Sequence, residues 1–231
     1  LSMNYEYLIF NAIVISGPAF FGSLKCCYIW NHLKPMLIAI AIPAIPFLLW
    51  DMFVTGTHWH FNPEYVSGIK IINLPIEEIL FFITVPFACL FTWEMIIRRV
   101  KEKPIDLQGL RLLLYLALPA GIYFFSIGKQ YTGLTLSFIF IANLVDQFLK
   151  TNLLFDKRFY FYLLLIVIFT LIFNGYLTWR PVVTYGVDYQ LDFRIITIPI
   201  EDFFYGISLL WMNTSLYKFL LRKNGVANVN K

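Results

Sequence analysis

Long runs without a charged residue constrain this chain more than any other feature of its sequence. Residues 159–179 form a run of 21 uncharged residues, and residues 7–24 form one of 18. A helix of about 20 apolar residues crosses the hydrocarbon layer of a bilayer, which is ~30 Å thick. The chain is 59% hydrophobic and 14% charged, whereas roughly a quarter of the residues in a soluble domain are charged. These runs predict an integral membrane protein and argue against a soluble all-α domain.

The apolar runs divide into about seven predicted helices, so the expected fold class is an all-α bundle in the membrane. The helices are expected at residues 5–24, 35–53, 74–97, 110–127, 130–149, 159–177 and 198–221. In the third and the seventh, the uncharged stretches 79–93 and 203–217 are only 15 residues long. To cross a bilayer, these two helices must include the carboxylates that flank them. Those acids then lie at the edge of the hydrocarbon or inside a cavity of the protein.

The basic residues predict the orientation of the chain. Of the 18 lysines and arginines, 14 fall on one side of the predicted helices, and four fall on the other, namely Lys70, Lys129, Arg180 and Arg194. Cytoplasmic loops of membrane proteins are enriched in Lys and Arg. We therefore expect a multi-pass protein of the cell membrane, in contact with membrane lipids, with its N-terminus outside and its C-terminus in the cytoplasm.

The chain contains an internal repeat with an offset of 124 residues. Residues 74–81, Leu-Pro-Ile-Glu-Glu-Ile-Leu-Phe, return as residues 198–205, Ile-Pro-Ile-Glu-Asp-Phe-Phe-Tyr. The same offset aligns the first three helices with the last three and leaves the fourth as a connector. Equivalent helices are four apart and cross in the same direction, so the repeats are parallel and related by a pseudo-two-fold axis along the membrane normal. We expect the first three-helix repeat in residues 1–103, the connector helix in 104–129 and the second repeat in 130–231.

Each repeat carries an acidic pair at the start of a helix. The pairs follow Pro75 and Pro199 and consist of Glu77, Glu78, Glu201 and Asp202. Acids in a first helical turn interact favourably with the helix dipole and can simply be solvated at a membrane surface. Against that interpretation, the pairs recur in both repeats, at a depth in the membrane where burying a carboxylate costs free energy. We therefore consider all four acids as candidate catalytic residues.

The spacing within each pair suggests that its two acids have different roles. Adjacent helix positions are about 100° apart, so one acid of each pair can face the bundle while the other caps or orients the chain. Two acids of opposite protonation state at one cavity would serve as general acid and general base. Asp51 and Asn174, near corresponding points of the second and sixth helices, could hydrogen-bond to these pairs. Aromatic residues beside the acids could line a cavity and stabilise a cation with their ring faces, and we consider Phe81, Phe82 and Phe204.

Several motifs of cofactor and metal sites are missing from the sequence. It contains no GxGxxG dinucleotide fingerprint, Walker A motif or Gly-x-Ser-x-Gly elbow, so no cofactor is expected. His58 and His60 flank Trp59 in an outer loop, but no HExxH or CxxC accompanies them, so we expect no metal site. Anchoring at the membrane interface is the better explanation of Trp59. We expect no nucleic-acid partner, and the oligomeric state stays open.

The motifs resemble those of the membrane-integral lycopene cyclases, which occur as two small subunits or as one fused chain. The matching segments are 59–68, 73–82, 174–178, 181–185 and 199–203. The resemblance implies closure of the ends of lycopene into β-ionone rings, via γ-carotene to β-carotene. It also implies that the acids of this family correspond to the four candidates above, and that Trp59 and Tyr185 belong to the substrate site.

The residues fit this chemistry. An acid protonates C2 of the terminal double bond, the C5=C6 alkene attacks the cation at C1, and a base removes the C6 proton. The reaction is a redox-neutral isomerisation, formally an intramolecular lyase reaction, and it needs a dry cavity because water would trap the cation. We expect Glu78 to be the acid and Glu201 the base or a stabilising group, with lycopene entering from the bilayer between helices.

Two other functions stay open at this point. A carotenoid 1,2-hydratase would let water trap the same C1 cation, so its product would be a tertiary alcohol instead of a ring. A proton-coupled membrane transporter also suits parallel repeats with central acids. Acids near one face of the membrane instead of its middle argue against the transporter.

Overall fold

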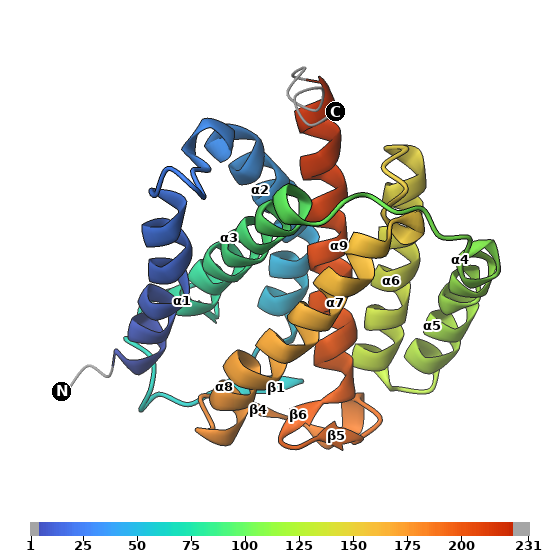
Figure 1. Ribbon diagram of the computed structural model, residues 1–231. Coiled ribbons are helices and arrows are strands. Elements are labelled where there is room, and N and C mark those ends of the chain that lie inside the picture. Colours follow the sequence, from blue (N-terminus) through green and yellow to red (C-terminus); the bar gives the residue numbers. More distant parts are fainter. Residues whose placement is uncertain (1–4, 224–231) are drawn as a thin grey trace.

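The helices form a single bundle of seven helical passes in the part of the chain that the structure describes. A pass here is one helix, or two consecutive helices, that runs from one end of the bundle to the other. This computed structural model describes residues 5–223 (Figure 1). The passes are α1 (Glu6–Gly22), α2 (Leu33–Val54), α3 (Ile76–Arg99), α4 (Gln108–Tyr115) with α5 (Ala117–Ser126), α6 (Gln130–Phe148), α7 (Lys157–Phe169) with α8 (Gly175–Trp179), and α9 (Ile200–Lys223). Each predicted helix is found within a few residues of its expected bounds, which confirms the all-α bundle.

Four of the passes are long and apolar enough to cross a membrane by length and composition alone. They are Trp30–Val54, Ile76–Arg99, Gln108–Ser126 and Lys157–Trp179. Helix α1 is apolar but has only 17 residues. Helices α6 and α9 carry more polar side chains because they lie inside the bundle. On α9, for example, Asn213, Thr214 and Ser215 are all 0% exposed.

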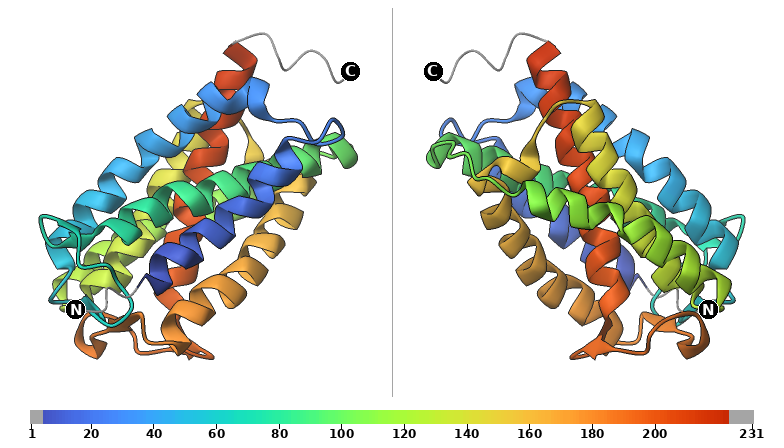
Figure 2. Two further views of the ribbon diagram at one scale, coloured as in Figure 1. Left: turned by 90° about the vertical axis from the view of Figure 1, so that its left-hand side faces the viewer. Right: turned by 90° about the vertical axis from the view of Figure 1, so that its right-hand side faces the viewer.

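Six short strands form three two-stranded sheets at one end of the bundle, beside the first turns of α3 and α9 (Figure 2). Strand β1 (Trp59–Phe61) pairs antiparallel with β4 (Val183–Tyr185). Strand β2 (Lys70–Ile71) pairs with β3 (Leu74–Pro75), and β5 (Arg194–Ile195) pairs with β6 (Ile198–Pro199). These hairpins end where α3 and α9 begin, so they cover the acidic pairs.

The backbone follows the repeat predicted from the sequence. Helices α3 and α9 each have 24 residues and begin 124 positions apart, and Ile72 and Ile196 share the same left-handed φ of 62°. Strands β1 and β4 are themselves repeat equivalents, and His60 lies opposite Thr184 at the centre of their pairing. The pseudo-two-fold axis therefore passes through this sheet. Residues 104–129, the expected connector, contain α4 and α5, and α5 packs along α6.

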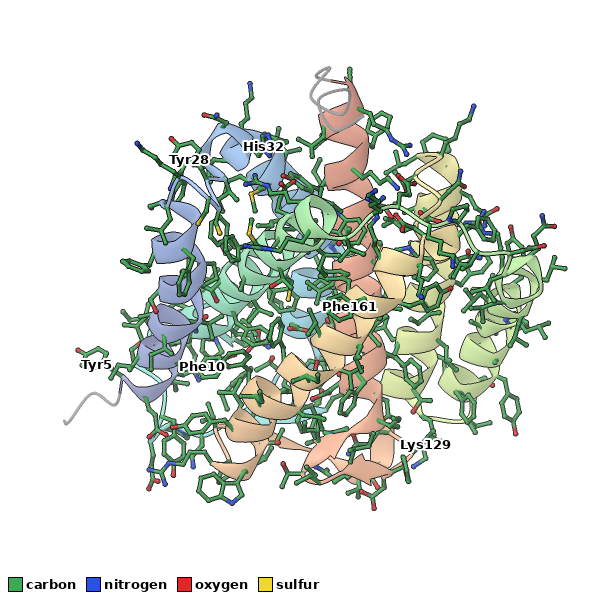
Figure 3. All side chains as sticks on the ribbon, in the orientation of Figure 1. Tyr5, Phe10, Tyr28, His32, Lys129 and Phe161 are labelled. Carbon is green, nitrogen blue, oxygen red and sulfur yellow. The ribbon has the colours of Figure 1, made fainter. Side chains whose placement is uncertain are left out.

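Ion pairs connect the helices at the end of the bundle opposite the strands. His32 lies at this end, whereas Lys129 lies near the strands (Figure 3). Glu94 contacts Arg98 at 3.2 Å, as its helical spacing indicates. The same spacing would pair Asp146 with Lys150, but this pairing is wrong, because Asp146 contacts Arg111 of α4 at 2.7 Å. Helix α6 has already ended at Phe148, and Lys150 has a left-handed φ of 52°, which removes it from the helical register.

Candidate active site

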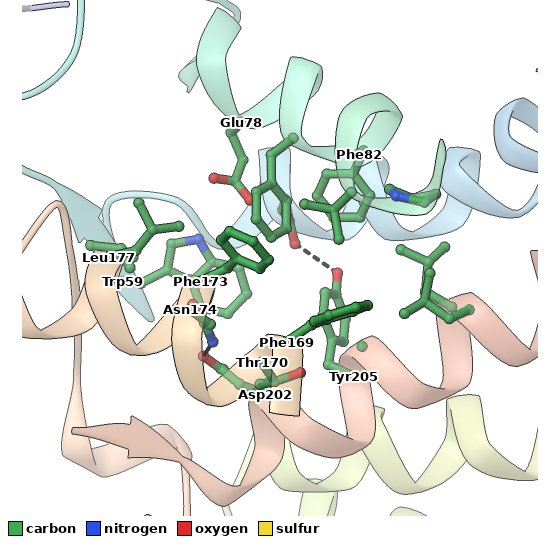
Figure 4. A pocket seen from close by; sticks show the side chains of 18 of the residues that line it. Trp59, Glu78, Phe82, Phe169, Thr170, Phe173, Asn174, Leu177, Asp202 and Tyr205 are labelled. Carbon is green, nitrogen blue, oxygen red and sulfur yellow. Dashed lines mark hydrogen bonds between the residues drawn. The ribbon is translucent and has the colours of Figure 1, made fainter. Parts of the chain in front are cut away.

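A cavity of about 120 Å³ lies between the two repeats, near the ends of α3 and α9 that carry the acids. Both repeats contribute to its walls. Glu78 enters from α3, Asp202 and Tyr205 enter from α9, and Phe169 and Asn174 come from the α7–α8 segment (Figure 4). Most of the lining is aromatic or aliphatic, so the few polar groups are concentrated on a small part of the wall.

The two carboxyl groups in the cavity are held in equivalent ways. Tyr7 on α1 donates a hydrogen bond to Glu78 Oε2 at 2.5 Å, and Tyr131 on α6 donates one to Asp202 Oδ1 at 2.5 Å. Both tyrosines are almost fully buried, at 2% and 3% exposed. Tyr7 and Tyr131 are 124 residues apart, as are Glu78 and Asp202. The pseudo-two-fold axis thus relates two tyrosine–carboxyl pairs across one cavity.

The other acid of each pair holds a covering loop. Glu77 Oε1 accepts a hydrogen bond from the backbone N–H of Ser67 at 2.8 Å, and Glu201 Oε1 accepts one from that of Leu191 at 2.8 Å. Thr132 also donates to Glu201 at 2.6 Å. Neither glutamate lines the cavity. The structure therefore places one acid of each pair at the cavity and the other at the loop, as the 100° step along a helix indicates.

One of the expected site residues does not reach the cavity. Glu201, which the sequence suggested as the base or stabiliser, lies outside the cavity, and its neighbour Asp202 faces it. Three of the four acids are also not solvated at the membrane surface, since Glu77 is 0%, Glu201 1% and Asp202 7% exposed, whereas Glu78 is partly buried. Pro75 lies just before α3, with φ −58° and ψ 143°, so the helix begins two residues later than expected and both acids occupy its first turn.

The second repeat adds two donors that the first repeat lacks. Asn174 donates to Asp202 Oδ2 at 2.6 Å, and Tyr185 donates to the same oxygen at 2.7 Å. The equivalent positions in the first repeat hold Trp50 and Phe61. Asp202 therefore accepts three hydrogen bonds, whereas Glu78 accepts one among the described residues. The suggested bond between Asn174 and an acidic pair is present.

A π-helical segment, Thr170–Asn174, places part of this wall. It separates α7 from α8 and directs Thr170, Phe173 and Asn174 into the cavity. Short π segments inside α-helices are frequent at functional sites. Helix α2, the equivalent in the first repeat, is continuous, and nothing in the sequence indicated the difference.

A third carboxyl group lines the same cavity. Asp51, at the end of α2, is 2% exposed, and Tyr205 donates a hydrogen bond to its Oδ1 at 2.7 Å. No hydrogen bond joins Asp51 to either acidic pair within residues 5–223, although the sequence had left such a bond open. Gly175 stands at the equivalent position of the second repeat, so this carboxyl has no counterpart there.

Aromatic rings form most of the remaining wall. Trp59, Phe81 and Phe82 line the cavity. Trp59 is only 5% exposed, so interfacial anchoring is the wrong explanation for it. Phe204 is 41% exposed and does not line the cavity, because the next side chain on α9, Tyr205, occupies the inward direction.

Sequence reasoning missed several cavity residues, namely Tyr7, Phe61, Tyr131, Phe169, Phe173 and Tyr205. A signal existed for two of them. Tyr7 and Tyr131 are identical residues at the repeat offset, and both stand near the start of a helix. Comparing the full repeats position by position would have singled them out. The others belong to aromatic runs in which the sequence alone does not distinguish inward from outward faces.

The histidines of the outer loop form contacts of another kind. His58 Nε2 is 2.8 Å from Gln130 Oε1, and its ring stacks on Tyr189 with centroids 3.9 Å apart. Burial lowers the pKa of His58, so the neutral ring is favoured. Among the described residues, no three His, Cys, Asp or Glu side chains gather in a way that could hold a metal ion.

Comparison with known proteins identifies the family. The family model described as lycopene cyclase matches residues 4–96 and again residues 128–220, so it covers both repeats and most of the chain. A bifunctional lycopene cyclase/phytoene synthase from Aspergillus niger is 34% identical over 82 residues, which are 33% of this chain. The matched part spans only 14% of that protein's length. No solved structure matches. The two matched segments are 124 residues apart, as the internal repeat is, and on this evidence the chain belongs to the lycopene cyclase family.

Proposed function

We propose that this protein is a lycopene β-cyclase that closes the ends of lycopene into β-ionone rings by acid–base catalysis in the membrane. One observation carries the proposal. Two repeat-equivalent carboxyl groups, Glu78 and Asp202, face one aromatic cavity, and a buried tyrosine orients each of them. The reaction needs one proton donor, one proton acceptor and a dry apolar chamber, and these are the groups present.

Glu78 is the proton donor in this proposal. The side chain lines the cavity, and its Oε2 accepts the hydrogen bond from Tyr7, while Oε1 has no hydrogen-bond partner among the described residues. A carboxyl group with a single donor in an apolar wall gains little from ionisation, so the protonated form is favoured. The proton on Oε1 is then available for C2 of the terminal double bond.

Asp202 is the proton acceptor. Its two oxygens accept hydrogen bonds from Tyr131, Asn174 and Tyr185. Hydrogen bonds to the charged form of a carboxyl group stabilise that form, so three donors favour the anion. The anion sits across the cavity from Glu78, where it stabilises the cation that forms on ring closure and then removes the C6 proton. This role replaces the one that the sequence suggested for Glu201.

The rest of the cavity protects the cation. Phe81, Phe169 and Phe173 present aromatic rings to it, and ring faces attract cations. A dry wall excludes water, which would otherwise add to the C1 cation. An apolar cavity of ~150 Å³ binds one benzene molecule, so the cavity of about 120 Å³ is smaller than one end group, whose ring carries extra methyl groups. The lining must therefore move apart to admit a single end group, and the rest of the polyene extends outside it.

The test is expression in bacteria that accumulate lycopene, with products separated by chromatography. Cyclic carotenes, which have the same mass as lycopene, are identified by retention time and visible absorption spectrum, and hydrated products by mass. We expect cyclic carotenes from the wild type and a loss of roughly 100-fold or more from Glu78→Gln and from Asp202→Asn. Glu77→Gln and Glu201→Gln are matched controls, because an amide oxygen can still accept the loop N–H. Near-normal cyclisation by either cavity variant would remove that residue from the mechanism.

The same assay separates the other enzyme and the transporter. A hydratase would give tertiary alcohols, heavier than lycopene by one water for each end. The apolar lining of the cavity favours the ring instead. A transporter would leave lycopene unchanged while the purified protein conducts protons into liposomes.

We also propose that the end with the strands faces the outside of the cell membrane and that α9 ends in the cytoplasm. The support is the distribution of basic residues, 14 of 18 of which lie toward the other end. Reporter fusions after residue 103 and after the last residue should both report the cytoplasm. Periplasmic signals from both would reverse the orientation, and a periplasmic signal from only one would contradict the even number of membrane crossings between them.

A further inference from the structure

We infer that Gly206 creates the space that receives the substrate end group and so determines which molecules the cavity accepts. This inference rests on the proposed cyclase function. Gly206 lies on α9, one residue after Tyr205, and it lines the cavity. A Cβ atom built at this position meets no atom within 4 Å apart from its chain neighbours and the backbone of its own helix. The open volume beside Gly206 is therefore part of the cavity described above, and we call this part the chamber.

The position of this glycine has no explanation in the fold alone. Gly206 stands in the interior of a 24-residue helix, has no left-handed φ and makes no close helix contact. Glycine is among the weakest helix formers, so an alanine there would be expected to strengthen the helix. By contrast, Gly121 and Gly133 permit a close approach of α5 and α6, where an added Cβ would meet backbone atoms at 2.7 and 2.6 Å. Gly206 keeps open a space that no protein atom fills.

The first repeat shows what happens when the same position is filled. The equivalent of Gly206 is Phe82, 124 residues earlier, and its side chain is 2% exposed. Its ring packs against Phe47, with centroids 6.4 Å apart. The backbones of α3 and α9 are alike, so this residue difference fills with a ring on the α3 side the space that stays open on the α9 side of the same cavity.

This asymmetry also orients the substrate. The wall of the same cavity includes Phe169 and Phe173, which come from the α7–π segment of the second repeat, and Gly206 lies one helical turn after Asp202 on α9. An end group held there lies beside Asp202, the group with three hydrogen-bond donors. A residue larger than glycine at 206 would push the end group out of line with both carboxyl groups. Misplacement by ~1 Å can cost about 100-fold in rate.

The experiment uses a graded series at this position. Gly206→Ala, Gly206→Leu and Gly206→Phe are purified in detergent from lycopene-accumulating cells and compared with the wild type. We expect roughly a tenfold loss of kcat/KM for the single methyl of alanine, since a methylene in an apolar pocket is worth about this factor. For leucine and phenylalanine we expect a loss of about 100-fold or more, with an unchanged or higher Tm.

Binding is measured apart from the reaction. Lycopene that co-purifies with the protein is quantified by its visible absorbance in a Glu78→Gln background, which should bind without converting. There, Gly206→Leu should lose most of the retained lycopene. Gly17→Leu is the matched control, because Gly17 also lies in a helix with open space around its Cβ but does not line the cavity.

The outcomes distinguish the two proposals. If the wild type retains lycopene but does not cyclise it, the cyclase function fails, while a loss of binding in Gly206→Leu still supports the chamber. If the wild type cyclises lycopene and the leucine and phenylalanine variants match it in turnover and retention, the chamber is wrong. Should those two variants fail to accumulate, unchanged turnover and retention in Gly206→Ala would overturn it as well.

Discussion

Two tyrosines at equivalent positions offer a test of which carboxyl group is the acid. Tyr7 donates to Glu78, and Tyr131 donates to Asp202, both at 2.5 Å. Tyr7→Phe and Tyr131→Phe each remove one hydroxyl group and leave the ring in place. A symmetric site would respond equally to the two changes. Under the proposed mechanism the responses differ, because Glu78 acts in its neutral form and Asp202 as an anion.

The size of the difference follows from the strength of the two hydrogen bonds. A hydrogen bond between neutral groups contributes about 0.5–1.5 kcal/mol, and one to a charged group about 1.5–3 kcal/mol. Each 1.36 kcal/mol changes a rate by about tenfold. Tyr7→Phe should therefore reduce cyclisation by roughly 2- to 10-fold, and Tyr131→Phe by roughly 10- to 150-fold. Both estimates assume that the lost energy appears entirely in the transition state.

The assay compares initial rates of lycopene conversion by the two purified variants at equal protein concentration. Thermal unfolding is measured in parallel, so that a loss of stability is not counted as a loss of rate. Asn174→Ala serves as a second removal of a donor from Asp202 and should resemble Tyr131→Phe. If Tyr7→Phe is as damaging as Tyr131→Phe, or more so, the assignment of Glu78 as acid and Asp202 as base is refuted.

Three further predictions concern the halves, the proton and the packing. Cutting the chain between Val100 and Lys101 preserves the bridge between Pro104 and Asp156, so the two pieces should regain activity when co-expressed; activity from residues 1–100 alone would contradict a site shared by both halves. In deuterated water, without oxygen, flavin, nicotinamide or metal, each new ring should gain one deuterium at C2, and activity that returns only with reduced flavin would disprove this. Gly133→Leu should destabilise the protein by roughly 1–3 kcal/mol, because its Cβ would meet backbone atoms of α5 at 2.6 Å; an unchanged Tm would show that α5 can move aside.

The helices and the repeat could be predicted because they depend on local patterns. Apolar runs specify where a chain can cross a membrane, and the repeated Pro-Ile-Glu-acid motif relates the two halves. The division of each acidic pair into one inward and one orienting residue also follows from the 100° step of a helix. The sequence does not determine which acid of each pair is the inward one. Whether Glu201 or Asp202 faces the cavity depends on how α9 is rotated, and this is set by its packing against α6 and α2.

The same limit explains the other differences. Phe204 and Tyr205 are adjacent aromatic residues, and only the rotation of α9 decides that Tyr205 reaches Asp51. The π segment before Asn174 depends on tertiary packing and has no mark in the sequence. Trp59 resembled an interfacial anchor because its position in the chain is a loop, but the pairing of β1 with β4 turns it inward.

A pseudo-two-fold site presents a chemical problem, because cyclisation needs two carboxyl groups in opposite protonation states. Symmetry alone would give Glu78 and Asp202 the same surroundings and therefore the same tendency to hold a proton. The residues shared by both repeats, such as the paired tyrosines, cannot resolve this. The difference must come from positions where the repeats diverge, and these positions lie on the cavity. Asn174 and Tyr185 donate to Asp202, whereas Trp50 and Phe61, their equivalents, make no hydrogen bond to Glu78 among the described residues. In the proposed mechanism, the repeat supplies the two carboxyl groups, and its departures from symmetry make Glu78 the acid and Asp202 the base.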